Sequence, residues 1–165
     1  MSRWKHSILL LLFLTGFSVC SGQGKAVNWL TFEQLEDSLV VKPKKVYIDF
    51  YADWCAYCKK MDAAAYKDPT IISILNTDYY AVKMNAEAIR EVAFDGQVFT
   101  NKQVGKRRNP VHEIALLLAS REGVPFSLPA IVILDTSFTI TERYFEYLSP
   151  KKLQIILNQK SPLID

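Results

Sequence analysis

The sequence has few of the residues from which stapled or metal-bound domains are made. Its 165 residues include 3 cysteines and 2 histidines. Three cysteines cannot form a disulfide framework, and a chain of this length does not need one to build a core. A structural zinc site takes four ligands, so we expect no metal. No apolar run reaches the length of about 18 residues that a membrane-spanning helix requires.

An excess of one charge is also lacking. Lysine and arginine number 20 against 17 aspartate and glutamate residues, which gives a formal net charge of +3. This balance is too weak to indicate a nucleic-acid partner, and we expect none. Hydrophobic residues make up 50% of the chain and charged residues 22%, a composition typical of a globular protein. The length corresponds to one ordinary domain and a short additional segment.

The N-terminus has the pattern of a secretory signal peptide. A basic start at Arg3 and Lys5 is followed by an apolar run over residues 8–17 and then by small and polar residues. The alternative is a buried N-terminal helix, which the polar end of the segment disfavours. We therefore expect residues 1–21 to be a signal peptide and residues 22–165 to form an exported, periplasmic domain.

Cys20 lies where the modified cysteine of a lipoprotein would lie. Lipidation motifs favour a small residue just before the cysteine and an aliphatic residue three before it, and Val19 and Phe17 depart from both preferences. A lipid anchor at Cys20 stays an open alternative to a soluble periplasmic protein. If cleavage follows Ser21, the mature chain keeps two cysteines.

The remaining chain alternates between strand and helix patterns. Runs rich in β-branched and aromatic residues predict strands, and Ser, Thr or Asp followed by helical periodicity predicts helix starts. Thr31 and Gln34 form a capping box, and Asp68-Pro69 and Ser149-Pro150 are further helix starts. The expected strands cover residues 27–30, 46–51, 79–84, 130–134 and 139–145, and the expected helices follow residues 31, 55, 68 and 149.

The stretch 86–127 is longer than a connection between neighbouring strands requires. A helix is expected from Asn109-Pro110 to a stop at Gly123, which leaves an insert of about 87–108. Asp95-Gly96 within Val92–Phe99 predicts an ordered hairpin. The basic residues that follow are expected to form a mobile surface loop; they are Lys102, Lys106, Arg107 and Arg108.

Two cysteines carry the chemistry. Cys55 and Cys58 follow a predicted buried strand and open a helix. Unpaired N–H groups at a helix N-terminus stabilise an anion, so the Cys55 thiolate is favoured. The spacing lets Cys58 reach the same side one turn later and form a disulfide with Cys55. Two other interpretations of the pair are less favourable. The cysteines could be half of a zinc site, but the sequence offers no further ligands for it. They could form a purely structural disulfide, but a bridge across one helical turn would restrict little chain entropy.

The run Val46–Lys59 resembles the active-site strand and helix of the thioredoxin family. The segments that continue the match to its exported members are Lys60–Asp62, Tyr66, Asp68-Pro69 and Val82–Asn85. The resemblance covers about residues 28–157, apart from the stretch 86–127. It implies an α/β thioredoxin fold, a central mixed β-sheet flanked by helices, with the insert between the second core strand and the helix before a cis-proline.

The resemblance also implies roles for residues around the cysteines. Asp49 matches a buried acid that accepts the proton of Cys58. A structural ion pair with Lys83 is the compatible alternative. Pro129 matches the cis-proline that faces the cysteines, where the backbone of Leu128 would pair with a substrate chain. Pro125 is an alternative match, as a strand-entry proline.

Taken together, these features predict a thiol-disulfide oxidoreductase that reduces or exchanges protein disulfides. Cys55 is the expected nucleophile, Cys58 the resolving thiol, and Trp54 an exposed platform beside them rather than a core residue. Ala56-Tyr57 is neither the Gly-Pro of reducing thioredoxins nor the Pro-His of strong oxidants. We expect a monomer, no cofactor, and a membrane thiol-disulfide reductase as electron donor. The alternative is a non-catalytic binding module that holds a partner with the insert and basic loop.

Overall fold

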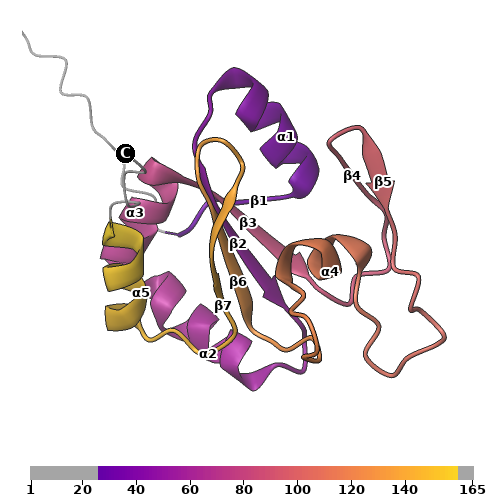
Figure 1. Ribbon diagram of the computed structural model, residues 1–165. Coiled ribbons are helices and arrows are strands. Elements are labelled where there is room, and N and C mark those ends of the chain that lie inside the picture. Colours follow the sequence, from indigo (N-terminus) through magenta and orange to yellow (C-terminus); the bar gives the residue numbers. More distant parts are fainter. Residues whose placement is uncertain (1–25, 160–165) are drawn as a thin grey trace, which may run out of the picture.

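A five-stranded mixed sheet forms the centre of the protein (Figure 1). The computed structural model describes residues 26–159, so the predicted signal peptide and Cys20 lie outside the described residues. The strands of the sheet are β1 (Trp29–Leu30), β2 (Lys45–Tyr51), β3 (Tyr79–Asn85), β6 (Ala130–Leu134) and β7 (Ile140–Tyr144). Their order is β1-β3-β2-β6-β7, in which the first three are parallel and the last two are antiparallel to their neighbours. This is the mixed sheet that the sequence predicts.

Helices cover both faces of the sheet. They are α1 (Phe32–Val41), α2 (Ala56–Ala63), the short 3₁₀ helix η1 (Ala65–Lys67), α3 (Pro69–Asp78), α4 (Glu113–Ala119) and α5 (Pro150–Asn158). Successive strand residues point to opposite faces. Tyr47 therefore packs with α2, α3 and α5, whereas Ile48 packs with α1 and α4. The carboxyl end of β2 leads directly into α2, which places the cysteine pair at one end of the sheet.

The predicted helix starts are confirmed by their side-chain bonds. The Thr31 hydroxyl accepts from the Gln34 N–H while the Gln34 side chain accepts from the Thr31 N–H. Asp68 and Ser149 cap α3 and α5. The helix expected to run from Cys55 to about Tyr66 is shorter, because α2 ends at Ala63 and the chain tightens into η1. That turn carries Tyr66 into the core, where its hydroxyl lies 3.0 Å from the Tyr47 hydroxyl.

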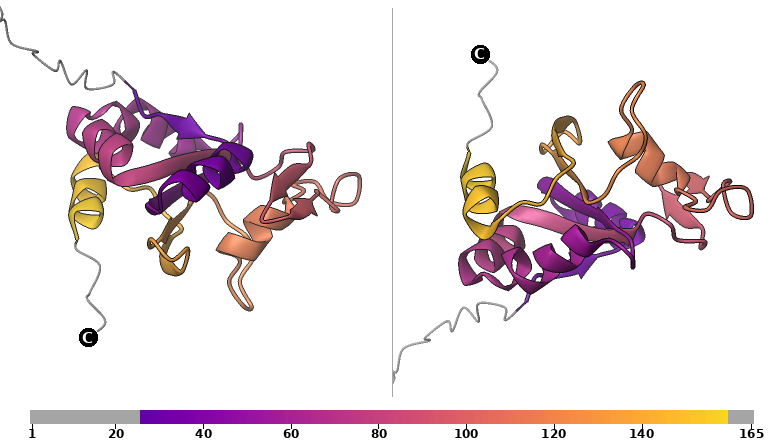
Figure 2. Two further views of the ribbon diagram at one scale, coloured as in Figure 1. Left: turned by 90° about the horizontal axis from the view of Figure 1, so that it is seen from above. Right: turned by 90° about the horizontal axis from the view of Figure 1, so that it is seen from below.

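The predicted hairpin is present and packs against α1. Its strands are β4 (Val92–Phe94) and β5 (Gln97–Phe99), and both turn residues, Asp95 and Gly96, have positive φ angles. The Phe94 ring lies 5.4 Å from that of Phe32. Figure 2 shows the hairpin and α4 on the side of the sheet away from α3 and α5. The hairpin thus folds back on the domain.

The helix predicted over 109–123 begins later and ends earlier, at Glu113 and Ala119. The residues just before it are held by side chains of the insert. The Gln103 amide oxygen accepts from the Val111 N–H at 3.1 Å, and the Pro110 carbonyl accepts from the amide of Asn101 at 3.1 Å. His112 then becomes the N-cap, since its Nδ1 accepts from the Ile114 N–H. Side-chain bonds from residues eight and nine positions earlier therefore hold the segment that precedes α4.

The basic loop follows the hairpin as a series of turns. Asn101, at its start, donates to the Ala88 carbonyl as well as to that of Pro110, at 3.1 Å each. Lys102 forms an ion pair with Glu113. The loop is thus tied at its base, and the mobility expected for Lys102–Arg108 stays a prediction.

Candidate active site

A disulfide joins Cys55 to Cys58 at the start of α2. Cys55 is the N-cap residue, and its sulfur accepts a hydrogen bond from the Cys58 N–H at 3.1 Å. In the disulfide form the two residues are 3% and 2% exposed, so exposure does not distinguish them. The two cysteines differ in their positions on the helix, because the Cys55 sulfur accepts a hydrogen bond from a backbone N–H of the first turn and the Cys58 sulfur does not. That bond and the helix dipole favour a thiolate on Cys55 once the bridge is reduced.

Trp54 and Leu128 lie beside the disulfide. Trp54 is 57% exposed, so it is not a core residue, and its indole N–H donates to the Glu87 carboxylate at 3.0 Å. Leu128 packs against the cluster formed by Ala52 and the two cysteines. The Leu128–Pro129 peptide bond is cis, and Pro129 directly precedes β6. Pro125 lies four residues earlier, outside β6.

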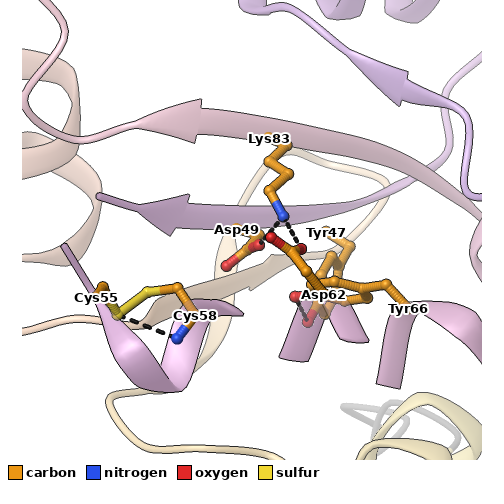
Figure 3. Close-up of polar contacts among 7 residues, drawn as sticks. All are labelled: Tyr47, Asp49, Cys55, Cys58, Asp62, Tyr66 and Lys83. Atoms are coloured by element: carbon orange, nitrogen blue, oxygen red, sulfur yellow. Dashed lines mark hydrogen bonds and ion pairs between the residues drawn. A yellow bond between two sulfur atoms is a disulfide. The ribbon is translucent and has the colours of Figure 1, made fainter. Parts of the chain in front are cut away.

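An ion-paired carboxyl lies behind the disulfide. Asp49 on β2 is opposite Lys83 on β3 in the register of the sheet, and its carboxylate lies 3.3 Å from the Lys83 ammonium. Lys83 also contacts the Asp62 carboxylate on α2. Figure 3 shows the Asp49 carboxyl between Lys83 and the Cys55–Cys58 bridge. Among residues 26–159, no hydrogen-bond partner reaches the second Asp49 oxygen, Oδ1, although it is buried.

The surroundings of Asp49 bring the pKa of its carboxyl towards neutral pH. Burial disfavours the charged carboxylate and raises the pKa of Asp49 from 3.8 to about 6. The Lys83 ammonium acts in the opposite direction, and the Asp62 charge adds to the increase. A carboxyl with this pKa gains and loses its proton close to physiological pH, as acid-base work requires.

Aromatic rings surround the Lys83 ammonium. It lies 5.2 Å from the Trp29 ring centre, 5.1 Å from that of Tyr51 and 5.0 Å from that of Tyr66. Such cation–π contacts hold a partly desolvated ammonium in place. Burial raises the pKa of the Tyr66 and Tyr47 hydroxyls, so both stay neutral. The charged groups behind the disulfide are therefore the two carboxylates and the ammonium.

Two residues near the cysteines were not predicted as site residues. Asp62 lies four residues after Cys58, a spacing that brings side chains to the same face of a helix and was available as a signal. Glu87 has no local signal, because its contact with Trp54 joins residues 33 positions apart. Both contacts depend on how strands and helices meet in three dimensions.

Two kinds of feature are absent from the part of the chain that the structure describes. No group of three or more His, Cys, Asp and Glu side chains within 26–159 comes together as a metal site. None of the helices in that range has the length and apolar character needed to cross a membrane.

Comparison with known proteins assigns the chain to a family. The family model for the thioredoxin-like domain matches residues 34–161. The protein therefore belongs to the thioredoxin-like family, as the sequence resemblance and the fold indicate. Its fold agrees with solved structures, among them a thioredoxin from Thermus thermophilus and a thioredoxin-fold protein from Helicobacter pylori. The first has a TM-score of 0.54 at 18% identity and the second 0.55 at 14%.

These structural matches cover most of each chain. For the Thermus protein they span 81% of this chain and 86% of that one, and for the Helicobacter protein 83% and 77%. Among curated proteins, protein disulfide-isomerase 5-2 of Arabidopsis thaliana is 30% identical over 115 residues, or 64% of this chain. Thiol:disulfide interchange protein DsbD of Salmonella typhi is 34% identical over 65 residues, or 38% of this chain. The chain spans only 25% and 12% of these two proteins.

Proposed function

We propose that this protein is a periplasmic thiol-disulfide oxidoreductase that reduces or exchanges protein disulfides through Cys55 and Cys58. The observation that carries the proposal is the hydrogen bond from the Cys58 N–H to the Cys55 sulfur at the start of α2. A thiolate favoured at that position is the nucleophile that disulfide exchange needs. The names of the relatives, a disulfide-isomerase and a thiol:disulfide interchange protein, support the same class of reaction.

The reaction proceeds in two exchanges. The Cys55 thiolate of the reduced protein attacks one sulfur of a substrate disulfide, forms a mixed disulfide with it, and releases the other substrate sulfur as a thiolate. Cys58 then attacks the Cys55 sulfur and releases the first substrate sulfur. The substrate gains two electrons, and the protein is left with the Cys55–Cys58 bridge seen in the structure.

Asp49 accepts the proton that Cys58 must lose before it attacks. Its burial, its pKa of about 6 and its unpaired oxygen support this role. Lys83 is a positioning residue, since it holds the carboxyl from the side away from the bridge. The ion pair between Asp49 and Lys83 is compatible with this role.

The substrate approaches over Leu128, Pro129 and Trp54. Leu128 contacts the disulfide cluster, and Trp54 is exposed next to Cys55. The chemistry is complete with two thiols and needs no cofactor. A membrane thiol-disulfide reductase is the proposed source of electrons that returns the bridge to its reduced form.

An insulin-reduction assay tests this function. The intact protein should catalyse reduction by dithiothreitol, and Cys55→Ser should abolish turnover. Ala63→Ser is the matched control, because it introduces the same side chain at an exposed position of α2 outside the Cys55–Cys58 motif and keeps both cysteines. Absence of turnover in the intact protein would instead support a binding module with an idle cysteine pair.

A further inference from the structure

Three lysines gather at the end of the sheet opposite the cysteine pair. Lys42 and Lys44 lie between α1 and β2, and Lys45 is the first residue of β2. The cysteine pair comes after the last residue of the same strand. Because a strand rises about 3.3 Å per residue, β2 places at least about 20 Å between the lysines and the start of α2. Binding at the lysines is therefore separate from the chemistry of the disulfide.

The three lysines line an open hollow with a volume of about 460 Å³. Asp78 is the one acidic residue among the described residues that line it, so an excess of positive charge remains. Partial burial and the charge of Lys42 lower the pKa of Lys44, whereas the charge of Asp78 acts in the opposite direction. An anion in the hollow would reduce the repulsion between the lysines.

Two of these lysines are held in place by their neighbours. The Lys44 ammonium donates to the Asn76 carbonyl at 3.2 Å and lies 5.1 Å from the centre of the Tyr80 ring. The Lys45 ammonium lies 5.7 Å from the centre of the Tyr79 ring. Such contacts restrict the side chains before a ligand arrives. An anion that binds them therefore costs less conformational entropy than one that must order free surface lysines.

Exposed apolar residues adjoin the lysines. Val40 and Val41 are the last two residues of α1, and they are 84% and 85% exposed. Pro43 is exposed between Lys42 and Lys44. Apolar side chains beside lysines are typical of surfaces that lie on a membrane, where the apolar groups enter the headgroup region and the lysines meet anionic lipids.

The chain enters the described structure at the same end. The Asn76 side chain donates to the Ala26 carbonyl at 3.0 Å and accepts from the Asn28 N–H at 2.8 Å. Because the Asn76 carbonyl also accepts from Lys44, one residue joins this entry point to the hollow. Cys20, at which a lipid anchor is an open alternative, precedes Ala26 by six positions, a length of chain that spans at most about 20 Å. A bilayer in contact with the lysines is within that reach.

We propose that Lys42, Lys44 and Lys45, together with Val40 and Val41, form a contact surface for the anionic phospholipids of a bilayer. The lysines bind the headgroup phosphates, and the valines enter the layer between the headgroups. The Cys55–Cys58 bridge then faces away from the bilayer, towards partners in the aqueous phase. This inference does not depend on the reaction proposed for the cysteine pair.

Sedimentation with lipid vesicles tests the contact. The protein is used in the form that cells produce, with vesicles of phosphatidylcholine alone and vesicles that contain equal parts of phosphatidylcholine and phosphatidylglycerol. Partitioning at low salt should be at least about tenfold stronger on the anionic vesicles, and added salt should reduce the difference. A contribution from residues outside 26–159 acts on both kinds of vesicle and cancels in the ratio. Equal partitioning on the two would overturn the inference.

Two triple variants with the same change of charge locate the contact. Replacement of Lys42, Lys44 and Lys45 by glutamine should bring the ratio of the two partition coefficients to about one. The control removes three charges from the exposed basic loop and should keep most of the ratio; its substitutions are Lys106→Gln, Arg107→Gln and Arg108→Gln. Equal losses in the two variants, or a loss in the control alone, would overturn the inference.

A change at the two valines tests the contact without a change of charge. Val40→Ser combined with Val41→Ser should weaken partitioning on anionic vesicles several-fold, because less apolar surface leaves the water. Both positions are exposed, so this variant should fold even if thermal unfolding shows that the lysine variant does not. Unchanged partitioning of a folded valine variant would overturn the part of the inference that concerns the valines.

Chemical modification on the vesicles measures the orientation. Bound anionic vesicles should slow the acetylation of Lys42 and Lys45 several-fold, while dithiothreitol reduces the Cys55–Cys58 bridge as fast as in solution. Slowed reduction of the bridge with unprotected lysines would reverse the orientation and overturn the inference. Protection of the lysines by free glycerol phosphate or by polyglutamate, but not by anionic vesicles, would instead indicate a soluble anion or an acidic protein as the ligand, and would also overturn it.

Discussion

The ammonium of Lys83 lies 3.3 Å from the buried carboxylate of Asp49, the residue directly opposite it in the parallel pair of strands β2 and β3. The same ammonium contacts Asp62, so one positive charge serves two carboxylates. Because Lys83 is shared between two carboxylates, it only partly offsets the cost of burying the charge of Asp49. The effect of burial is therefore larger than that of the ion pair, and the pKa of Asp49 rises. Stability and reactivity should therefore both depend on this group.

Asp49→Asn should stabilise the folded protein at neutral pH. Between about pH 4 and pH 6 the folded protein holds a proton on Asp49 that the unfolded chain has lost, so the stability of the wild type falls as the pH rises through this window. Asparagine carries no charge at any of these pH values, so the variant does not lose stability as the pH rises through this window. Its free energy of unfolding at pH 7 should therefore exceed that of the wild type by about 1–3 kcal/mol. Urea unfolding from pH 3.5 to 7.5 measures the effect, which should vanish near pH 4. Asp53→Asn, at an exposed position, should change little; lower stability of Asp49→Asn at pH 7 would contradict the prediction.

Asp62→Asn should move this window to lower pH. It removes a negative charge that raises the pKa of Asp49 and leaves Lys83 to Asp49 alone. The NMR titration of the Asp49 carboxyl carbon should shift from about pH 6 towards 4. Asp37→Asn on the exposed face of α1 is the control. A midpoint that stays in place would mean that Asp62 has no influence on the carboxyl.

Asp49→Ala should slow the release of substrate from the mixed disulfide. Cys58 then loses its nearby proton acceptor, and general-base assistance commonly contributes about a hundredfold or more to a rate. Stopped-flow measurement at pH 7 should show resolution slowed by at least about tenfold, while the first attack by Cys55 changes less. An unchanged rate of resolution, in a variant that unfolds cooperatively, would leave Asp49 with a structural role only.

In the reduced protein, Cys55 should react before Cys58. Its sulfur is the one that accepts an N–H of the first turn of α2, and this bond favours the reactive thiolate. Brief alkylation at pH 7 followed by peptide mapping should label Cys55 in large excess. Labelling after unfolding in urea is the control, since the two thiols should then react equally. Preferential labelling of Cys58 in the folded protein would reverse the assigned roles.

Asn101→Ala should destabilise the insert region. The Asn101 side chain is nearly buried and donates to two carbonyls, those of Ala88 and Pro110. Loss of both bonds leaves buried acceptors unsatisfied and should lower the free energy of unfolding by about 1–3 kcal/mol. Asn158→Ala, at an exposed position near the end of α5, should cost much less in the same urea titration. Equal effects of the two variants would mean that the base of the insert contributes no special stability.

The sequence predicts the sheet and most helix starts because their signals are local. The buried runs of β2 and β6 and the capping residues Thr31, Asp68 and Ser149 depend on neighbours in the chain. The start of α4 does not, since the side chains of Asn101 and Gln103 hold the preceding residues extended. Pro110 has the local appearance of a helix start and lies outside the helix. Local pattern thus fails where distant side chains bind the backbone.

The residues of the candidate site also differ in whether the sequence predicts them. Cys55 and Cys58 follow from motif and placement, and Asp49, Leu128 and Pro129 enter through the family resemblance. Glu87 could not be predicted, because its partner Trp54 precedes it by 33 residues and the two meet only when β3 leaves the sheet. A hydrogen bond between side chains from separate elements has no periodicity to reveal it.

The His112 N–H donates to the Ala86 carbonyl at 2.8 Å, so the backbone leaves the core and returns to it at nearly the same point. The entropy of closing a loop grows only slowly with its length. Residues 104–109 can accordingly be lengthened or exchanged for a segment from another protein at little cost to the sheet, provided that this junction is kept. The hairpin cannot, because Val92 is buried in the core and Phe94 packs against Phe32. A new segment can therefore be inserted between the two ends of this junction. Such an insertion would change the surroundings of the disulfide without changes to the sequence of the sheet.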